Sequence, residues 1–271
     1  MTHTKLQSLA LEARRIILEQ AYRAHTGHIG CALSVVQILT ALYFGELKAK
    51  SPSDPNRDRF ILSKGHAAPA LHAILYLKGW ISKRELSSSH GNNTYLGVHP
   101  EYGLAGVELA TGSLGQGLSV ATGIALAAQM QKKKFRCFAL LSDAECNEGS
   151  VWEAAAFAAH HRLYNLTAVI DLNGQQGFGY TKDVLDISPL KDKWRAFGWT
   201  VRETSEDLPQ LARVLHAKNA STRPTVVIVR TTFGHGVSFM RKKIDWHYLP
   251  LSKEQYLQAL EEVALERKNI S

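Results

Sequence analysis

Two side chains with oxygen donors follow two apolar segments of the sequence, and together they could bind a divalent ion. Asp143 follows "FALLS" (138–142), and Asn173 follows "LTAVIDL" (166–172). About one β-α-β unit separates them, so both should lie at the carboxyl edge of a parallel sheet, on neighbouring or near-neighbouring strands. With a backbone carbonyl from "NGQQ" (173–176), they form a set that Mg²⁺ accepts, phosphate oxygens and water completing its octahedron. A helix after Asp143 would offer N–H donors to the same phosphates.

A second interpretation of these residues is open from the pattern alone. Asp and Asn are also common helix-capping residues, so Asp143 by itself could simply begin the helix that follows it. The occurrence of both residues at strand ends, with Gly174 after the second, favours ligand binding over capping.

The elements that must position these residues alternate along the chain. Apolar runs predict strands at 60–62, 136–141, 166–173 and 225–231, with another near 200, while helical spacing or composition predicts the intervening helices. Such alternation predicts an α/β fold in which helices flank a parallel sheet. The predicted helices are 6–21, 34–44, 67–79, 112–131, 152–163, 208–220 and a C-terminal helix 252–268 with Ser252 as its N-cap; the predicted long loops are 87–103 and 233–248.

Composition narrows the class of protein. The chain has 271 residues, of which 45% are hydrophobic and 21% charged, which is typical of globular proteins. Its net charge of +8 favours anionic partners, either nucleic acid or phosphorylated metabolites. The basic clusters Lys132–Lys134 and Arg241–Lys243 are short and not interleaved with aromatic residues, so we expect no nucleic-acid groove. The role of the second cluster stays open.

The cellular location is predicted from what the sequence contains. No apolar run has the length of a membrane span, so we expect no membrane partner. The first 25 residues do not follow the pattern of a signal peptide. Cys31, Cys137 and Cys146 form no CxxC pair, which suits a reducing cytoplasm.

The Asp143–Asn173 pair, with "EGSVWEA" (148–154) after its first member, resembles the thiamine diphosphate motif of transketolases. The resemblance extends over nearly the whole chain and implies a thiamine diphosphate-binding fold, with 1–271 as a single diphosphate- and Mg²⁺-binding domain. Further segments resemble the family in the family's order: "TGHIG" (26–30), "SKGHAAPALHA" (63–73), "GVHPE" (97–101), "TGSLGQGLS" (111–119) and "VSFMRKKIDWH" (237–247).

The resemblance implies a role for each matching position. Mg²⁺, with Ca²⁺ or Mn²⁺ as alternatives, would be bound by Asp143, Asn173 and the backbone carbonyl of Gln175. Glu148 matches an acidic residue that links paired active sites. The histidines matching the family's active-site channel are His28, His66, His99 and His247. The cofactor-binding positions are His66, Gly112, Leu114, Gln116, Asp143, Ala144, Glu145 and Asn173.

The implied activity is transfer of a two-carbon ketol unit from a ketose (phosphate) donor to an aldose (phosphate) acceptor. Protons must leave and return to sugar oxygens, which imidazole does near neutral pH, while the cofactor is the electron sink. The sequence does not identify the sugars. His235 matches no position with a role, and five histidines in helix-like segments are expected to be structural or exposed: His25, His72, His160, His161 and His216.

The chain departs from the family pattern in two ways. The family motif has Gly-Asp-Gly where this chain has Ser142-Asp143-Ala144, and a methyl group at Ala144 crowds the cofactor and disfavours positive φ. We therefore expect weakened cofactor binding, with complete loss as the alternative. The chain also ends where the family's first domain ends, before the domain whose glutamate activates the cofactor.

This second departure predicts a split transketolase. A separate subunit would carry the pyrimidine-binding and C-terminal domains, in an α₂β₂ assembly, and this chain would expose an apolar face to it and be inactive alone. Two alternatives stay open: a degenerate transketolase-like subunit that binds a partner but no cofactor, and a related thiamine diphosphate enzyme such as deoxyxylulose-phosphate synthase.

Overall fold

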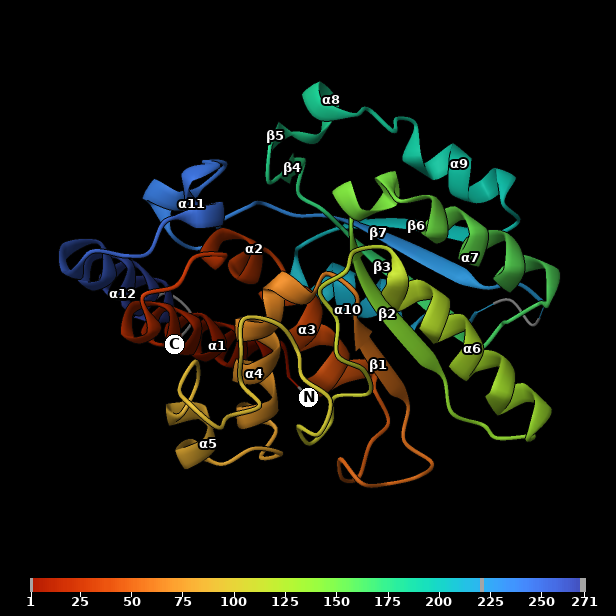
Figure 1. The fold of residues 1–271 in the computed structure, drawn as a ribbon, viewed down its shortest axis with the longest axis horizontal. Helices are drawn as coiled ribbons and strands as arrows, with labels where there is room; N and C mark the ends of the chain where they lie inside the picture. The colour runs from red at the N-terminus through yellow and green to blue at the C-terminus, as the bar shows by residue number, and fades with distance from the viewer. Residues whose placement is uncertain (1, 220–221, 269–271) are drawn as a thin grey trace.

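A five-stranded parallel sheet forms the centre of the molecule (Figure 1). The computed structural model describes residues 2–219 and 222–268. The predicted α/β architecture is confirmed. In spatial order the strands are β1 (Arg59–Leu62), β2 (Cys137–Ser142), β3 (Leu166–Leu172), β7 (Thr225–Arg230) and β6 (Thr200–Ser205).

Helices cover both faces of the sheet because apolar strand residues alternate between them. Phe138 and Leu140 of β2 belong to one buried cluster, and Ala139 and Leu141 to the other. The first cluster includes residues of α1 (His3–Ala24), α2 (Ile29–Ser34), α3 (Val36–Ala41), α4 (Ala68–Leu77), α10 (Leu208–His216), α11 (Asp245–Tyr248) and α12 (Lys253–Lys268). The second includes residues of α6 (Gln116–Met130), α7 (Gly149–His160) and α9 (Leu190–Ala196), seen to the right in Figure 1.

The segment after α1 differs from its prediction. The sequence predicts one helix over residues 34–44, but the chain forms α2 and α3 in succession and then a π-helical turn, Leu42–Glu46. Gly30 lies inside α2. A Cβ there would lie 2.1 Å from the ring of Phe233, so the glycine allows close packing against the loop after β7.

The predicted helix ends and long loops are refined by the structure. α10 ends at His216, and Ala220, the predicted end, lies outside the described residues. Ser252 caps α12: its hydroxyl accepts from the N–H of Gln255, whose side chain accepts from the N–H of Ser252. The loop 233–248 contains a 3₁₀ turn, Ser238–Met240, and α11. The remaining elements are α5 (Lys83–Ser87), the hairpin β4 (Gln175–Gln176) and β5 (Gly179–Tyr180), α8 (Thr181–Val184), and 3₁₀ turns at Gly65–Ala67 and Ala144–Asn147.

The fold brings the ends of β2 and β3 together. The two strands are parallel neighbours, with Ser142 opposite Asp171, so the segments that follow them leave the sheet at the same edge. The hairpin β4–β5 and α8 stand above this edge (Figure 1). Among the described residues, no helix combines the length and the apolar character needed to cross a membrane.

Candidate active site

Asp143 has a buried carboxylate in which one oxygen accepts hydrogen bonds from the described residues and the other does not. It is 1% exposed. Its Oδ2 accepts hydrogen bonds from the N–H of Gly174 at 2.9 Å and the hydroxyl of Thr181 at 3.0 Å. Its Oδ1 is buried without a hydrogen-bond partner in the described chain. Burial, with a smaller contribution from Asp171, raises the pKa of Asp143 to about 6, so a cation beside Oδ1 would stabilise the ionised form.

Asp171, at the end of the neighbouring strand, is fully satisfied. It is 0% exposed and forms an ion pair with Lys64, itself buried. Its oxygens also accept from the hydroxyl of Ser34 at 2.8 Å and from the hydroxyl of Thr231. Sequence reasoning missed this pair. The signal was present: a carboxylate inside the apolar run "AVIDL" requires a buried partner, and Lys64 directly follows the strand run "FILS".

The same carboxylate orients Asn173. The side-chain NH₂ of Asn173 donates to Asp171 Oδ2 at 2.9 Å. Its Oδ1 is therefore on the other side, where it accepts from the N–H of Gln175 at 2.9 Å. Asp171 thus determines which end of the amide is available as an oxygen ligand.

A cavity of about 630 Å³ opens beside these strand ends, and histidines form part of its lining. The rings of His28, His66 and His247 have centroids 5.0–5.7 Å apart, although they come from segments far apart in sequence. His28 has φ 60°, and its N–H donates to the carbonyl of His247 at 3.0 Å, which ties the start of α2 to α11. His99 lines the same cavity, so all four predicted histidines meet here.

The local environment favours the neutral form of three of these imidazoles. Burial is the main cause in each case. It lowers the pKa of His66 well below its ordinary value, with Lys64 the next contributor. It lowers the pKa of His247 to about 4, with His28 and Lys64 contributing, and it lowers the pKa of His28, with His99 contributing. At neutral pH these side chains are therefore uncharged, each with an unprotonated ring nitrogen.

Further parts of the lining come from the glycine-rich segment and from the segment that contains Asp143. Gly112, Leu114, Ala144 and Glu148 line the cavity. A Cβ at Gly112 would lie 3.2 Å from the ring of His99, so a side chain there would crowd this wall. Ala144 lies in the 3₁₀ turn Ala144–Asn147, whose backbone any residue can adopt. The expected strain from a positive φ at Ala144 is therefore absent in this segment of the described chain, while the residue does form part of the cavity lining.

Three predicted cofactor-binding residues, Gln116, Asp143 and Glu145, are not among the described residues that line the cavity. Asp143 lines a smaller cavity together with Thr181. Gln116, the first residue of α6, is exposed. Glu145 is buried and accepts hydrogen bonds from the hydroxyl of Ser63, the N–H of Gly115 at 2.8 Å and the N–H of Ser142 at 3.3 Å. It ties three segments together next to the cavity, which is a supporting position.

Several lining residues were not anticipated from the sequence. Besides Lys64, they include Cys31, whose Sγ is 3.4 Å from Nδ1 of His247. Gln175, predicted as a backbone ligand, also lines the cavity, and its side-chain NH₂ donates to the carbonyl of Lys242 at 2.9 Å. The basic cluster Arg241–Lys243 is thus attached to the site through its backbone, while its side chains are exposed.

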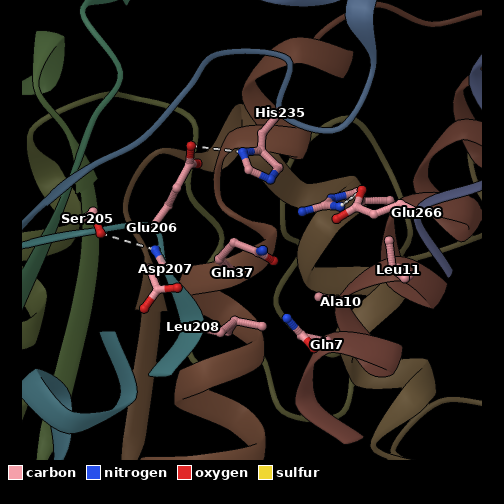
Figure 2. Close-up of a pocket in the computed structure, with 11 residues that line it drawn as sticks. Gln7, Ala10, Leu11, Gln37, Ser205, Glu206, Asp207, Leu208, His235 and Glu266 are labelled. Carbon is pink, nitrogen blue, oxygen red and sulfur yellow. Dashed lines mark hydrogen bonds and ion pairs between the residues drawn. The ribbon is translucent and has the colours of Figure 1, made fainter. Parts of the chain in front are cut away.

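The remaining histidines lie elsewhere. His72 is fully buried in α4, where burial lowers its pKa to about 3. Figure 2 shows His235 turned toward Glu206, with 2.8 Å between Nδ1 and the carboxylate, in a separate cavity of about 370 Å³. There Arg14 also pairs with Glu266 at 2.8 Å. His235 therefore belongs to a second cavity, whose lining contains two ion pairs.

Comparison with known proteins places this geometry in context. The chain matches the family model for the transketolase thiamine diphosphate binding domain over residues 6–269. It is 39% identical to an apulose-4-phosphate transketolase subunit of Phocaeicola vulgatus, over 98% of this chain and 99% of that protein. It is 38% identical to 6-deoxy-6-sulfo-D-fructose transketolase subunit SqwG of Clostridium sp., over 96% of this chain and 97% of that protein.

A solved structure gives the same picture of the fold. The transketolase from Campylobacter jejuni is similar with a TM-score of 0.91 and 29% identity, over 97% of this chain and 43% of that one. The chain therefore spans less than half of that transketolase, but nearly the full length of the two subunits.

Proposed function

The chain belongs to the transketolase family, and we propose that it is the thiamine diphosphate-binding subunit of a two-chain transketolase. In this role it transfers a two-carbon ketol unit from a ketose to an aldose. The observation that carries the proposal is the unpaired, buried Oδ1 of Asp143 beside a cavity lined by histidines whose environment favours the neutral form. The near full-length similarity to two transketolase subunits supports the two-chain form.

The oxygen atoms at the strand ends fit a hard divalent ion. Asp143 Oδ1, Asn173 Oδ1 and the backbone carbonyl of Gln175 would be its protein ligands, and Mg²⁺ is the ion we propose, with Ca²⁺ or Mn²⁺ able to replace it. The fit rests on Asp143: a buried carboxylate oxygen without a partner among the described residues is costly, and a bound cation removes that cost.

The cavity residues also fit the cofactor. Gly112 has no side chain where one would crowd His99, and Leu114 and Ala144 provide apolar contacts beside it. When bound, thiamine diphosphate supplies the thiazolium that accepts electrons when the C–C bond is cleaved. Gln116 and Glu145 would contribute indirectly, since Glu145 fixes the segments that bear Gly115 and Ser142.

The chain's own residues would then move protons and position the sugar. Histidines 28, 66, 99 and 247 would accept protons from sugar hydroxyls and return them, which requires imidazoles that are neutral at the working pH. His28, His66 and His247 meet this requirement, because burial lowers the pKa of each. The positive charge of Lys64 also lowers the pKa of His66 and His247. The ion pair with Asp171 keeps this ammonium group in place.

A partner chain would complete the site. Five large apolar side chains near the cavity are at least 41% exposed, and we call them the apolar rim: Phe178, Tyr180, Val184, Leu185 and Tyr248. Exposed apolar groups of this kind are typical of interaction surfaces. We propose that a chain with pyrimidine-binding and C-terminal domains covers the rim in an α₂β₂ assembly. Glu148, exposed at the start of α7, would link the paired sites.

The substrates and location are proposed more coarsely. The net charge of +8 suits phosphorylated sugars such as those of the pentose phosphate reactions. The two subunits compared above are named for different sugars, so they do not select one. The three free thiols, all buried, suit a reducing cytoplasm.

Calorimetry tests the proposal directly. The purified chain, titrated with thiamine diphosphate and excess Mg²⁺, is expected to bind, and Asp143→Asn is expected to bind far more weakly. Glu206→Gln, in the second cavity, is the matched control and should bind like the wild type. Binding that is equal in all three proteins contradicts the assignment of the strand-end site.

A second candidate function is favoured by one observation, the presence of Ala144 in the cavity lining. In a degenerate subunit its methyl group would exclude the cofactor, and this chain would only bind its partner. The same titration, repeated with the partner chain present, separates the two functions: saturable cofactor binding supports the enzyme, and its absence supports the degenerate form. Ketol transfer by this chain alone would contradict the two-chain form.

A further inference from the structure

Three side chains with nitrogen and sulfur donors meet at the cavity wall. His28, Cys31 and His247 each offer one ligand atom, and these atoms lie within 4.8 Å of one another. Over residues 2–219 and 222–268 this is the one such group of three or more His, Cys, Asp or Glu residues. The hard oxygen donors of Asp143 and Asn173 are not part of it.

The spacing is close to that of a tetrahedral zinc site. With Zn–S near 2.3 Å and Zn–N near 2.0–2.1 Å, neighbouring ligand atoms of a tetrahedron are about 3.3–3.6 Å apart. The Sγ of Cys31 and Nδ1 of His247 are 3.4 Å apart, which already meets this requirement. The remaining pairs lie within 4.8 Å, so they need to approach by at most about 1.5 Å to reach the tetrahedral spacing.

The site is accessible and partly preorganised. All three residues line the cavity of about 630 Å³, so an ion can reach them and a fourth position is left for water. The hydrogen bond from the N–H of His28 to the carbonyl of His247 fixes the two histidine segments relative to each other. Nδ1 of His28 is buried without a hydrogen-bond partner among the described residues.

The cationic Lys64 belongs to the same cavity lining, and an ion pair reduces its opposition to a bound cation. Its ammonium group is paired with the buried carboxylate of Asp171. The cysteine is also specific to this place: Cys137 and Cys146 are equally buried but are not among the described residues lining the cavity.

We propose that His28, Cys31 and His247 form a second metal site, selective for borderline-soft divalent ions and best suited to Zn²⁺. A thiolate with two imidazoles is a set that zinc prefers and Mg²⁺ does not. An ion bound there would coordinate His28 and His247, which transfer protons in the proposed function. If that function holds, zinc occupancy and ketol transfer exclude each other; the binding itself does not depend on it.

Co²⁺ is the first probe, because its absorption spectrum depends on the type and geometry of its ligands. Added to the metal-free wild-type chain with excess Mg²⁺ present, it should give tetrahedral d–d absorption and a thiolate-to-cobalt charge-transfer band, and stoichiometric Zn²⁺ should remove both. This measurement needs no variant. A spectrum without a thiolate band overturns the proposal.

Zn²⁺ affinity, measured by competition with a chromophoric chelator, identifies the thiol. Cys31→Ser should weaken binding by more than about tenfold, and Cys137→Ser, which alters an equally buried thiol, should not. Circular dichroism confirms that both variants are folded. Equal affinities in the two variants overturn the proposal. Failure of ketol transfer in the assembled enzyme contradicts the proposed function but leaves these binding results intact.

Discussion

Two aspartates at neighbouring strand ends have the same chemistry and opposite environments. Asp143 follows β2 and Asp171 lies within β3, and they are 1% and 0% exposed. Asp171 is paired with Lys64 and accepts from Ser34, Asn173 and Thr231. Asp143 has no buried lysine of its own, and one of its oxygens lacks a partner among the described residues.

We interpret the difference as that between a structural carboxylate and one proposed to bind a ligand. A buried charge is tolerated when it is paired and hydrogen-bonded, so Asp171 contributes to the stability of the free protein and orients Asn173. A half-satisfied buried charge destabilises the free protein, so Asp143 is best explained by a ligand that is present in the working state. We therefore propose that the same residue type at the same sheet edge serves stability in one case and binding in the other.

The largest expected effect comes from breaking the pair at Asp171. Lys64→Met leaves that carboxylate buried without its counter-charge, and we expect the free energy of unfolding to fall by about 3–5 kcal/mol. Urea denaturation of the metal-free chain measures this loss. The double variant Lys64→Met/Asp171→Leu removes both charges and should recover most of it. A loss below about 1 kcal/mol in the single variant would mean that the ion pair is not the stabilising feature described here.

A pH series should distinguish the two aspartates in the metal-free protein. The pKa of Asp143 is about 6 when folded and near 3.9 when unfolded, so between these values the native state holds a proton that the unfolded state has lost. The free energy of unfolding should therefore fall as pH rises from about 4 to about 6, by about 3 kcal/mol in total for this group.

Comparison with Asp143→Asn isolates that contribution, because the amide does not titrate. Urea denaturation of both proteins with a chelator present should give curves that diverge as pH rises, the variant becoming the more stable. Parallel curves would show that the carboxylate is ionised at no cost, and would contradict the contrast with Asp171.

The third effect concerns binding. Asp143→Asn replaces a charged ligand by a neutral one, and we expect thiamine diphosphate in the presence of Mg²⁺ to bind about 100-fold more weakly, or about 2.7 kcal/mol. Calorimetry measures the affinity, and the fold should be retained because the amide oxygen can still accept from Gly174 and Thr181. A variant that binds as tightly as the wild type would remove Asp143 from the metal site.

Much of this arrangement could be predicted from the sequence. Apolar runs and helical spacing predicted the parallel sheet, and the position of Asp143 and Asn173 one β-α-β unit apart placed them at one edge. Matching motifs predicted that the four histidines belong to one channel, and all four line one cavity. These features depend on local pattern and on strand direction, both of which can be read along the chain.

The remaining features depend on contacts between distant segments. Glu145 accepts hydrogen bonds from Ser63 and Gly115 and does not line the cavity. This position results from the packing of three segments and cannot be read from the neighbouring residues in the sequence. Cys31 meets His247 only because α11 packs beside α2. Strain at Ala144 was predicted because the family has a glycine at this position. Whether strain occurs depends on the backbone conformation of the turn, which is a 3₁₀ turn here.

The smallest expected effect comes from that last residue, which stands beside Asp143 at the end of β2. Because Ala144 lies in a 3₁₀ turn, Ala144→Gly relieves no backbone strain, and only the loss of its methyl group from the cavity lining can affect the cofactor. We expect affinity for thiamine diphosphate to rise by no more than about tenfold, or about 1.4 kcal/mol, while the metal-free chain loses about 0.5–1 kcal/mol of stability to the flexibility of glycine.

Calorimetry and urea denaturation on the same preparation measure both changes, with Ala154→Gly in α7 as a control that should lose stability without any gain in affinity. A gain of about 100-fold or more would mean that the methyl group blocks the diphosphate, and that Ala144, as much as Asp143, governs binding at this strand end. A gain within the expected range leaves the charge of Asp143 as the dominant difference between the two strand ends.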